Sequence, residues 1–160
     1  MHKLIYLLAL LAFLPSVSAK EIKIKWRDTV EYAELAASRE KAAKDKKFIT
    51  ILVSNKTYDS DNQGAQAAAD VIEDTIKAMK SISIVVRCSY ENARSIKQDE
   101  FGKAAIEGLK KAGNGLPMIV VVDPSTNKLV EVLMPRTIQQ DGSKAFRGVK
   151  KKARELKKKK

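Results

Sequence analysis

Three segments of the chain are almost continuously apolar and short enough to be strands. They are Phe48–Ser54, Ile82–Cys88 and Met118–Val122. Runs of this length that are rich in β-branched residues and lack polar alternation are typical of strands covered on both faces. We therefore expect these three segments to form the centre of a buried sheet.

Two further strands are indicated by different patterns. Ile22–Trp26 alternates apolar and charged residues, as a half-buried strand does. Lys128–Met134 follows Asp123–Asn127, a segment of turn-forming residues. Because so short a turn joins antiparallel neighbours, we expect Met118–Val122 and Lys128–Met134 to form an antiparallel hairpin.

The remaining periodic segments predict four helices. At the start of the first helix, Asp28 and Glu31 have the spacing of a capping box. Gly113 ends the third helix, and the apolar residues of the fourth helix lie on one stripe. The polar segments Asn55–Gly64 and Ser89–Lys97 read as loops. The expected helices are Thr29–Lys44, Ala65–Lys80, Asp99–Ala112 and Ser143–Leu156, the last with Phe146, Val149, Ala153 and Leu156 on its stripe.

The predicted element order is β-α-β-α-β-α-β-β-α. Alternation at the front of the chain predicts parallel strands joined by crossover helices, and the closing hairpin makes the sheet mixed. We expect an α/β fold of three layers, with helices on both faces of the sheet. A length of 160 residues is typical of a single domain.

The first 19 residues have the layout of a secretory signal. Lys3 is followed by the uncharged apolar run Leu4–Leu14, and Ser16–Ala19 offers small residues for cleavage. Eleven apolar residues are too few for a membrane span, which needs about 20. We expect a signal peptide over residues 1–19, a single domain over 20–160, and export to a periplasm or the cell exterior. The alternatives are an uncleaved anchor or a buried core helix.

Composition narrows the chemistry. Residues 20–160 contain no histidine and one cysteine, Cys88. Catalytic triads, histidine-based metal sites and an internal disulfide are therefore excluded for this part of the chain, and we expect no catalytic residue, bound metal or cofactor.

The net charge of +12 comes mainly from one end. From Lys144 onward there are ten Lys and Arg residues and one acid, so the rest of the domain is close to neutral. No aromatic side chain lies among the lysines for base stacking, which makes nucleic acid an unfavoured partner. The basic residues in question are Lys150, Lys151, Lys152, Lys157, Lys158, Lys159 and Lys160.

Several segments resemble the thioredoxin-like superfamily. Trp26-Arg27-Asp28 and the segment Ala42–Lys47 before the first buried strand are similar to the opening of secreted thioredoxin-like proteins. Gly115–Pro124 resembles the family's G-x-P-T-x-x-x-x-D-P segment. The resemblance covers roughly residues 23–156. It implies a thioredoxin-like sandwich in which Pro117 is cis and lies beside the site that is active in the family.

The chain departs from the family where the redox chemistry would lie. Family oxidoreductases carry Cys-x-x-Cys after the strand that corresponds to Phe48–Ser54, but Ser54–Gly64 contains no cysteine. Without a thiolate there is no mixed-disulfide step. Phe48 stands where the family usually has a proline after the lysine pair, and Leu116 stands where threonine is common before Pro117. The resemblance therefore implies the fold without the dithiol activity.

Two candidate sites keep alternatives open. Cys88 is either a buried packing residue, the interpretation we favour, or a reactive or intermolecular thiol with Arg87 as the neighbouring cation. Asp59–Asp70 partly mimics a calcium loop, but a solvated loop in which Asp61 or Asn62 caps the next helix accounts for it better.

We predict an exported, thioredoxin-like protein without a redox dithiol, which binds a peptide or protein partner or has a structural role. The alternatives are a one-thiol redox protein and an electrostatic binder of an acidic polymer or membrane through the basic tail. The expected binding groove consists of Thr57, Tyr58, Asp59, Ser60, Leu116 and Pro117.

Overall fold

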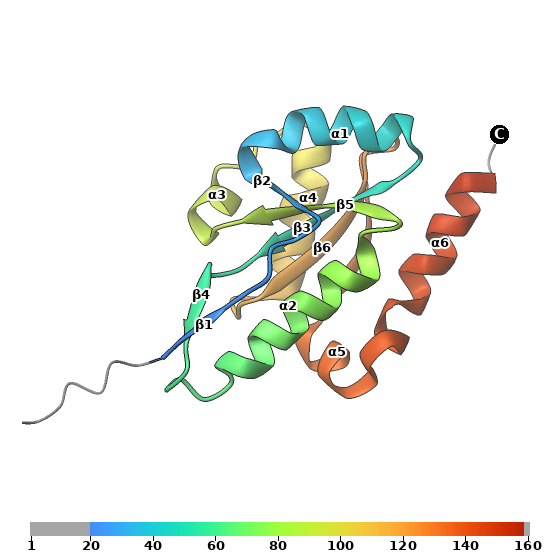
Figure 1. The fold of residues 1–160 in the computed structure, drawn as a ribbon. Coiled ribbons are helices and arrows are strands. Elements are labelled where there is room, and N and C mark those ends of the chain that lie inside the picture. Colours follow the sequence, from blue (N-terminus) through green and yellow to red (C-terminus); the bar gives the residue numbers. More distant parts are fainter. Residues whose placement is uncertain (1–19, 159–160) are drawn as a thin grey trace, which may run out of the picture.

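Five strands form a mixed central sheet in the computed structural model, which describes residues 20–158 (Figure 1). The sheet order is β2-β5-β3-β6-β7, with β2, β5 and β3 parallel and with β6 and β7 antiparallel to their neighbours. The strands are β2 (Thr29–Glu31), β3 (Phe48–Val53), β5 (Ser83–Cys88), β6 (Met118–Asp123) and β7 (Lys128–Leu133).

The apolar runs predicted the centre of this sheet well. Strands β3, β5, β6 and β7 each begin and end within one residue of the predicted segments. All six residues of β3 and of β6 are buried, because helices cover both faces of these strands. The expected parallel arrangement of Phe48–Ser54 and Ile82–Cys88 and the closing hairpin are confirmed.

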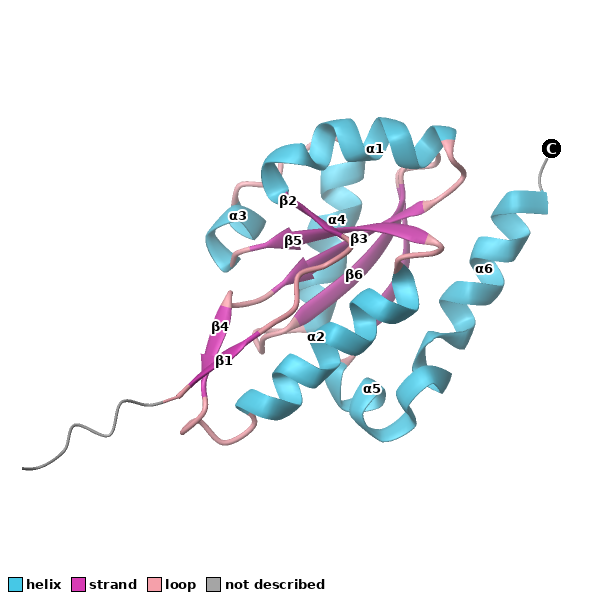
Figure 2. Cartoon of the chain, viewed as in Figure 1, coloured by secondary structure: helices cyan, strands magenta, loops and turns pink. Residues whose placement is uncertain are grey.

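Helices pack on both faces of the sheet (Figure 2). One face is covered by α1 (Leu35–Lys44) and α4 (Glu100–Ala112), whose Ala42, Phe101 and Ala105 share a buried cluster with β3. The opposite face is covered by α2 (Ala65–Met79), α5 (Pro135–Asp141) and α6 (Arg147–Lys158), which contribute Ile72, Ile138 and Val149 to a second cluster. The protein therefore has an α/β fold of three layers.

The N-terminal segment is arranged differently from the prediction. Strand β1 (Glu21–Lys23) pairs antiparallel with β4 (Thr57–Asp59) in a separate two-stranded sheet, so Ile22–Trp26 does not supply the first strand of the central sheet. That position is taken by β2, which lies within the segment predicted as the start of the first helix. Asp28 has a φ of 62°, a left-handed conformation that does not lead into a helix.

Other boundaries also differ from the expectations. The first helical residues are the 3-10 turn η2 (Tyr32–Glu34), where the Glu31 main-chain N–H donates to the Glu34 carboxylate. Neither Asp61 nor Asn62 caps α2, since its N-cap is Gly64 with a φ of 91° and no side-chain cap. The polar segments predicted as loops contain β4 and the short helix α3 (Tyr90–Arg94). Helix α5 and the turn η3 (Gly142–Phe146) precede α6.

The termini of the chain bear on two predictions. The predicted signal peptide, residues 1–19, and the last two residues of the basic tail, Lys159 and Lys160, lie outside the described residues. Within residues 20–158, none of the helices has the length and apolarity that crossing a bilayer requires.

Candidate functional site

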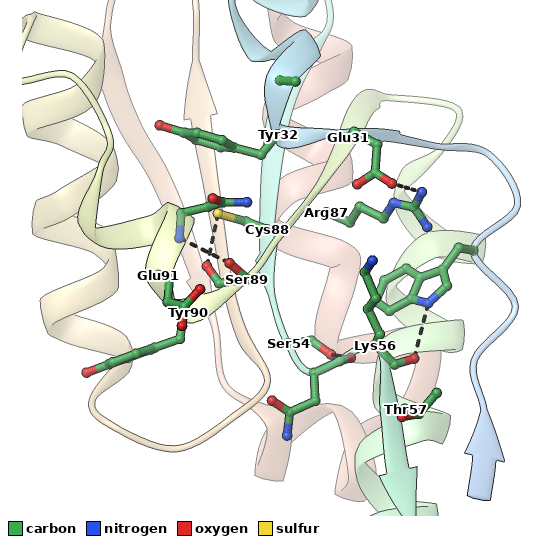
Figure 3. A pocket seen from close by; sticks show the side chains of 14 residues that line it. Glu31, Tyr32, Ser54, Lys56, Thr57, Arg87, Cys88, Ser89, Tyr90 and Glu91 are labelled. Atoms are coloured by element: carbon green, nitrogen blue, oxygen red, sulfur yellow. Dashed lines mark hydrogen bonds and ion pairs between the residues drawn. The ribbon is translucent and has the colours of Figure 1, made fainter.

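A pocket of about 860 Å³ opens at the carboxyl ends of the parallel strands (Figure 3). In open α/β sheets this edge is where ligands bind, because the connecting loops diverge there and leave a crevice. Strands β2, β3 and β5 all end at the pocket, and α3 and the segment before β4 form its rim. The lining residues are Trp26, Glu31, Tyr32, Ala33, Ser54, Asn55, Lys56, Thr57, Arg87, Cys88, Ser89, Tyr90, Glu91 and Asn92.

The floor of the pocket is held by sheet hydrogen bonds. Ser54 continues β3, and its main-chain N–H donates to the Cys88 carbonyl at the end of β5, with an N···O distance of 3.0 Å. On the other side of β3, Val53 lies opposite Met118 in the antiparallel register with β6. Continuing that register by one residue brings Pro117 beside Ser54. The Leu116–Pro117 peptide bond is cis, as the resemblance implied.

One wall of the pocket is built around Trp26. Its indole N–H donates to the Lys56 carbonyl at 3.4 Å, which joins the segment after β1 to the segment before β4. The Arg87 guanidinium lies 5.8 Å from the centre of the Trp26 ring and forms an ion pair with Glu31. The Nε atom of Arg87 is buried and has no hydrogen-bond partner within residues 20–158. This wall therefore joins the end of β2 to the end of β5 through the Glu31–Arg87 ion pair.

The opposite wall is the short helix α3. The Ser89 hydroxyl accepts a hydrogen bond of 3.1 Å from the Asn92 main-chain N–H and so caps the helix. Tyr90 follows with 40% of its surface exposed, and the Arg94 guanidinium lies 4.6 Å from the centre of its ring. The cap and this cation–π contact hold Tyr90 at the rim.

Tyr90 also lines a second, more apolar pocket of about 400 Å³ between α3 and α4. The two pockets therefore have one lining residue in common, the aromatic side chain of Tyr90. The residues that line the second pocket are Tyr90, Ala93, Arg94, Gln98, Ile106, Leu109, Lys110, Gly113, Asn114 and Met118.

Burial suppresses ionisation at the pocket floor. Removal from water raises the pKa of the Cys88 thiol from 9.0 to about 12, and the Sγ–H donates to the Ser89 carbonyl at 3.3 Å. The pKa of the Tyr32 hydroxyl is also raised, mainly by burial and secondly by its closeness to the Cys88 thiolate. A thiol with this pKa is protonated at neutral pH and is a poor nucleophile. The expectation that Cys88 is buried is confirmed.

The described residues offer no cluster for a metal ion. No three His, Cys, Asp or Glu side chains of residues 20–158 come close enough together to hold one. In the segment that partly mimics a calcium loop, the Asp59 carboxylate accepts from the Asp61 main-chain N–H, and Asp70 accepts from the Gln66 side chain. These carboxylates belong to local hydrogen bonds.

The structure brings together only part of the groove predicted from the sequence. Of its six residues, only Thr57 lines the large pocket. Tyr58 is buried in the core and shares a hydrogen bond of 3.3 Å with Ser54. The others are placed as follows: Asp59 and Ser60 are exposed, Leu116 is half-buried against the core, and Pro117 is buried beside the pocket floor.

The predicted packing of the last helix is confirmed. Phe146, Val149 and Ala153 are buried and Leu156 packs against them. Lys152 is exposed and also donates to the Val130 carbonyl at 2.7 Å and pairs with Glu131 at 3.0 Å. Of the other predicted tail residues, Lys150 is half-buried, and Lys151, Lys157 and Lys158 are exposed.

Most pocket residues were not singled out from the sequence. Tyr32, Arg87 and Tyr90 each lie at or just beyond the end of a parallel strand. The tendency of ligands to bind at carboxyl strand ends points to Arg87 and Tyr90 from the predicted strand Ile82–Cys88, whereas Tyr32 follows β2, which was not predicted. Trp26 was named as the end of a predicted strand and as part of a family resemblance, but not as a site residue.

Comparison of the sequence with models of known protein families finds no match, and comparison with characterised proteins finds none either.

Proposed function

We propose that this chain is an exported protein of thioredoxin-like fold that binds an extended polypeptide segment along the two adjoining pockets and has no dithiol redox activity. The fold-family part of the proposal is supported by the arrangement of the sheet. Parallel β2, β5 and β3 are followed by an antiparallel β6–β7 hairpin, with helices on both faces. A cis proline precedes β6, as it does in the family that the sequence resembles.

The observation that carries the binding proposal is the pair of pockets that meet at Tyr90. A small ligand would fill one pocket, whereas an extended chain can place alternate side chains in both. The large pocket is lined by five serine, threonine and asparagine side chains that can hydrogen-bond to a main chain, and the second pocket offers apolar contact. The five are Ser54, Asn55, Thr57, Ser89 and Asn92.

The aromatic side chains favour the same reading. Trp26, Tyr32 and Tyr90 line the large pocket, and aromatic residues are enriched at interfaces because they supply large contact areas at low cost in conformational entropy. The charges of the lining nearly balance, with Lys56 and Arg87 against Glu31 and Glu91. A strongly anionic ligand therefore finds little net attraction here.

The absence of redox activity in the proposal rests on two features of the residues. The segment from Ser54 to Gly64 holds no cysteine, so the attacking cysteine of the family's oxidoreductases has no counterpart in this segment. Cys88 is buried and its raised pKa keeps it protonated. A single protonated thiol has no resolving partner for disulfide exchange.

Trp26 is the only tryptophan in the chain and lies in the pocket wall, so its fluorescence reports on the site directly. We would titrate the full exported chain with an unfolded, cysteine-blocked polypeptide and with peptides cut from it. Binding should change the Trp26 emission with a saturable dependence on concentration. Free amino acids and dipeptides should not produce the change, because they cannot occupy both pockets.

The matched variants are Tyr90→Ala and Met134→Ala, since these two residues are the large apolar side chains exposed to similar extents, 40% and 43%. Tyr90→Ala should weaken polypeptide binding about tenfold or more, the loss of roughly one interface hot spot. Met134→Ala should leave it unchanged. Equal affinity in all three proteins, or disulfide-reducing turnover that disappears in Cys88→Ser, would overturn the proposal.

A further inference from the structure

Helix α6 carries a row of basic side chains on the face that points away from the protein. Val149 and Ala153 are buried against the sheet layer, and the residues about half a turn from them face outward. Helix α6 lies at the edge of the molecule, with one side free along its length (Figure 1). The row consists of Arg147, Lys151, Arg154 and Lys158, all of them exposed, and is called the basic ridge below.

The charges of the basic ridge are not neutralised by the protein. Within residues 20–158, the one α6 cation that has an acidic partner is Lys152, which is turned toward β7 and bonded to Glu131. The four ridge residues take part in no ion pair of the described residues. Between Arg147 and Lys158 there are seven basic residues and one acid, Glu155, so the helix concentrates positive charge that the neutral body lacks.

The spacing of the ridge fits contact along a surface. Its members follow one another at intervals of four, three and four residues, so at about 1.5 Å per residue the row is about 16 Å long. The apolar side chains of α6 are turned inward, so the outward face has none to insert between acyl chains. Contact through this face would be electrostatic and would involve the whole helix lying flat.

We propose that the basic ridge docks the protein reversibly onto an anionic lipid surface. Anionic lipid headgroups are the ligand that the basic ridge fits best. They diffuse in the membrane plane, so their spacing need not match that of the four cations, and a flat membrane contacts all four cations at once. A nucleic acid is less suited: the ridge is a convex row rather than a groove, and no aromatic side chain accompanies it for base stacking. This inference is independent of the polypeptide-binding proposal.

The expected strength follows from the number of cations. Each Lys or Arg near an anionic leaflet contributes about 1 kcal/mol, which corresponds to roughly a fivefold change in the partition coefficient. Removing two of the four cations should therefore weaken binding about 30-fold. Attraction of this kind falls steeply as salt rises, because surface charges are screened.

The test is co-sedimentation of the full exported chain with large vesicles, made either of phosphatidylcholine alone or of phosphatidylcholine with phosphatidylglycerol. The ridge variant is Lys151→Gln with Arg154→Gln. The matched control is Lys41→Gln with Lys44→Gln, which removes two exposed cations at the same three-residue spacing from α1, without altering the ridge. Thermal unfolding of each variant establishes that all are folded.

We expect binding only to the phosphatidylglycerol vesicles, weakened about 30-fold in the ridge variant and by raised salt, and nearly unchanged in the control. Equal losses in the two variants would mean that net charge alone acts, and would overturn the proposal. So would binding to a duplex DNA oligonucleotide with no binding to vesicles. Because polypeptide binding is read from Trp26, failure of either proposal leaves the other intact.

Discussion

Replacing Cys88 by alanine should make the stability of the protein less sensitive to alkaline pH. The thiol is 4% exposed at the end of β5, and burial raises its pKa from 9.0 to about 12. Above about pH 9 the unfolded chain releases the thiol proton while the folded chain retains it. The folded state then binds more protons than the unfolded state, so the free energy of unfolding falls as the pH rises through this range.

The size of the effect follows from the two pKa values. At about pH 10 the unfolded thiol is largely ionised and the folded thiol is not, which lowers the free energy of unfolding by about 1 kcal/mol. The effect is absent near pH 7, where both states are protonated. Alanine has no ionisable group, so the variant lacks the pH-dependent contribution of the thiol to the free energy of unfolding. It retains the contributions of most other ionisable groups.

The assay is urea unfolding of the wild type and Cys88→Ala, each at about pH 7 and about pH 10. The loss between the two pH values should be larger for the wild type by about 1 kcal/mol. Native-state alkylation gives a second reading: at about pH 8 a thiol of this pKa is ionised to about one part in 10⁴, so labelling should be slow. Equal losses in the two proteins together with rapid labelling would refute the reasoning.

Two further predictions concern packing and capping. A Cβ added at Gly108 would lie 2.4 Å from Val120 Cγ1, so Gly108→Ala should lower the free energy of unfolding by about 1–3 kcal/mol. Gly115→Ala, where nothing lies within 4 Å, is the urea-unfolding control. Asp99→Ala should cost about 1 kcal/mol near neutral pH, since the carboxylate accepts from the Gly102 N–H at 2.7 Å and caps α4. The Arg39 hydrogen bond lowers the Asp99 pKa, so this contribution should be lost as the pH falls through that pKa, and a variant that is equally destabilised at acid and neutral pH would contradict this.

The sequence pattern predicted the parts of the fold that depend on burial. Continuous apolar runs marked β3 and β6 because both faces of these strands are covered, and 3.6-residue periodicity marked α2 and α4. The short strands β2 and β4 were missed because their partners lie far along the chain. Thr29–Glu31 becomes a strand by pairing with β5, and Thr57–Asp59 by pairing with β1. No local pattern in three residues records such a pairing.

The candidate site was less predictable than the fold for the same reason. It is assembled from the ends of three strands and from α3, so its residues are neighbours only once the sheet has formed. Leu116 and Pro117 were placed beside the right edge but pack inward, whereas Tyr90 lay in a segment that was expected to be a loop. The local signal for α5 was present and overlooked: Pro135 stands at the first turn of the helix, where proline is favoured.

The central claim, that an extended polypeptide lies along the two pockets that meet at Tyr90, is tested most directly by mapping amide chemical shifts. The isotopically labelled full chain would be titrated with a peptide that changes the Trp26 emission. The account predicts shift changes at the Trp26 indole, at the Asn55 and Asn92 side-chain amides, and at Leu109 in the second pocket. Changes confined to α6, or spread evenly over the protein with none at Trp26, would contradict it.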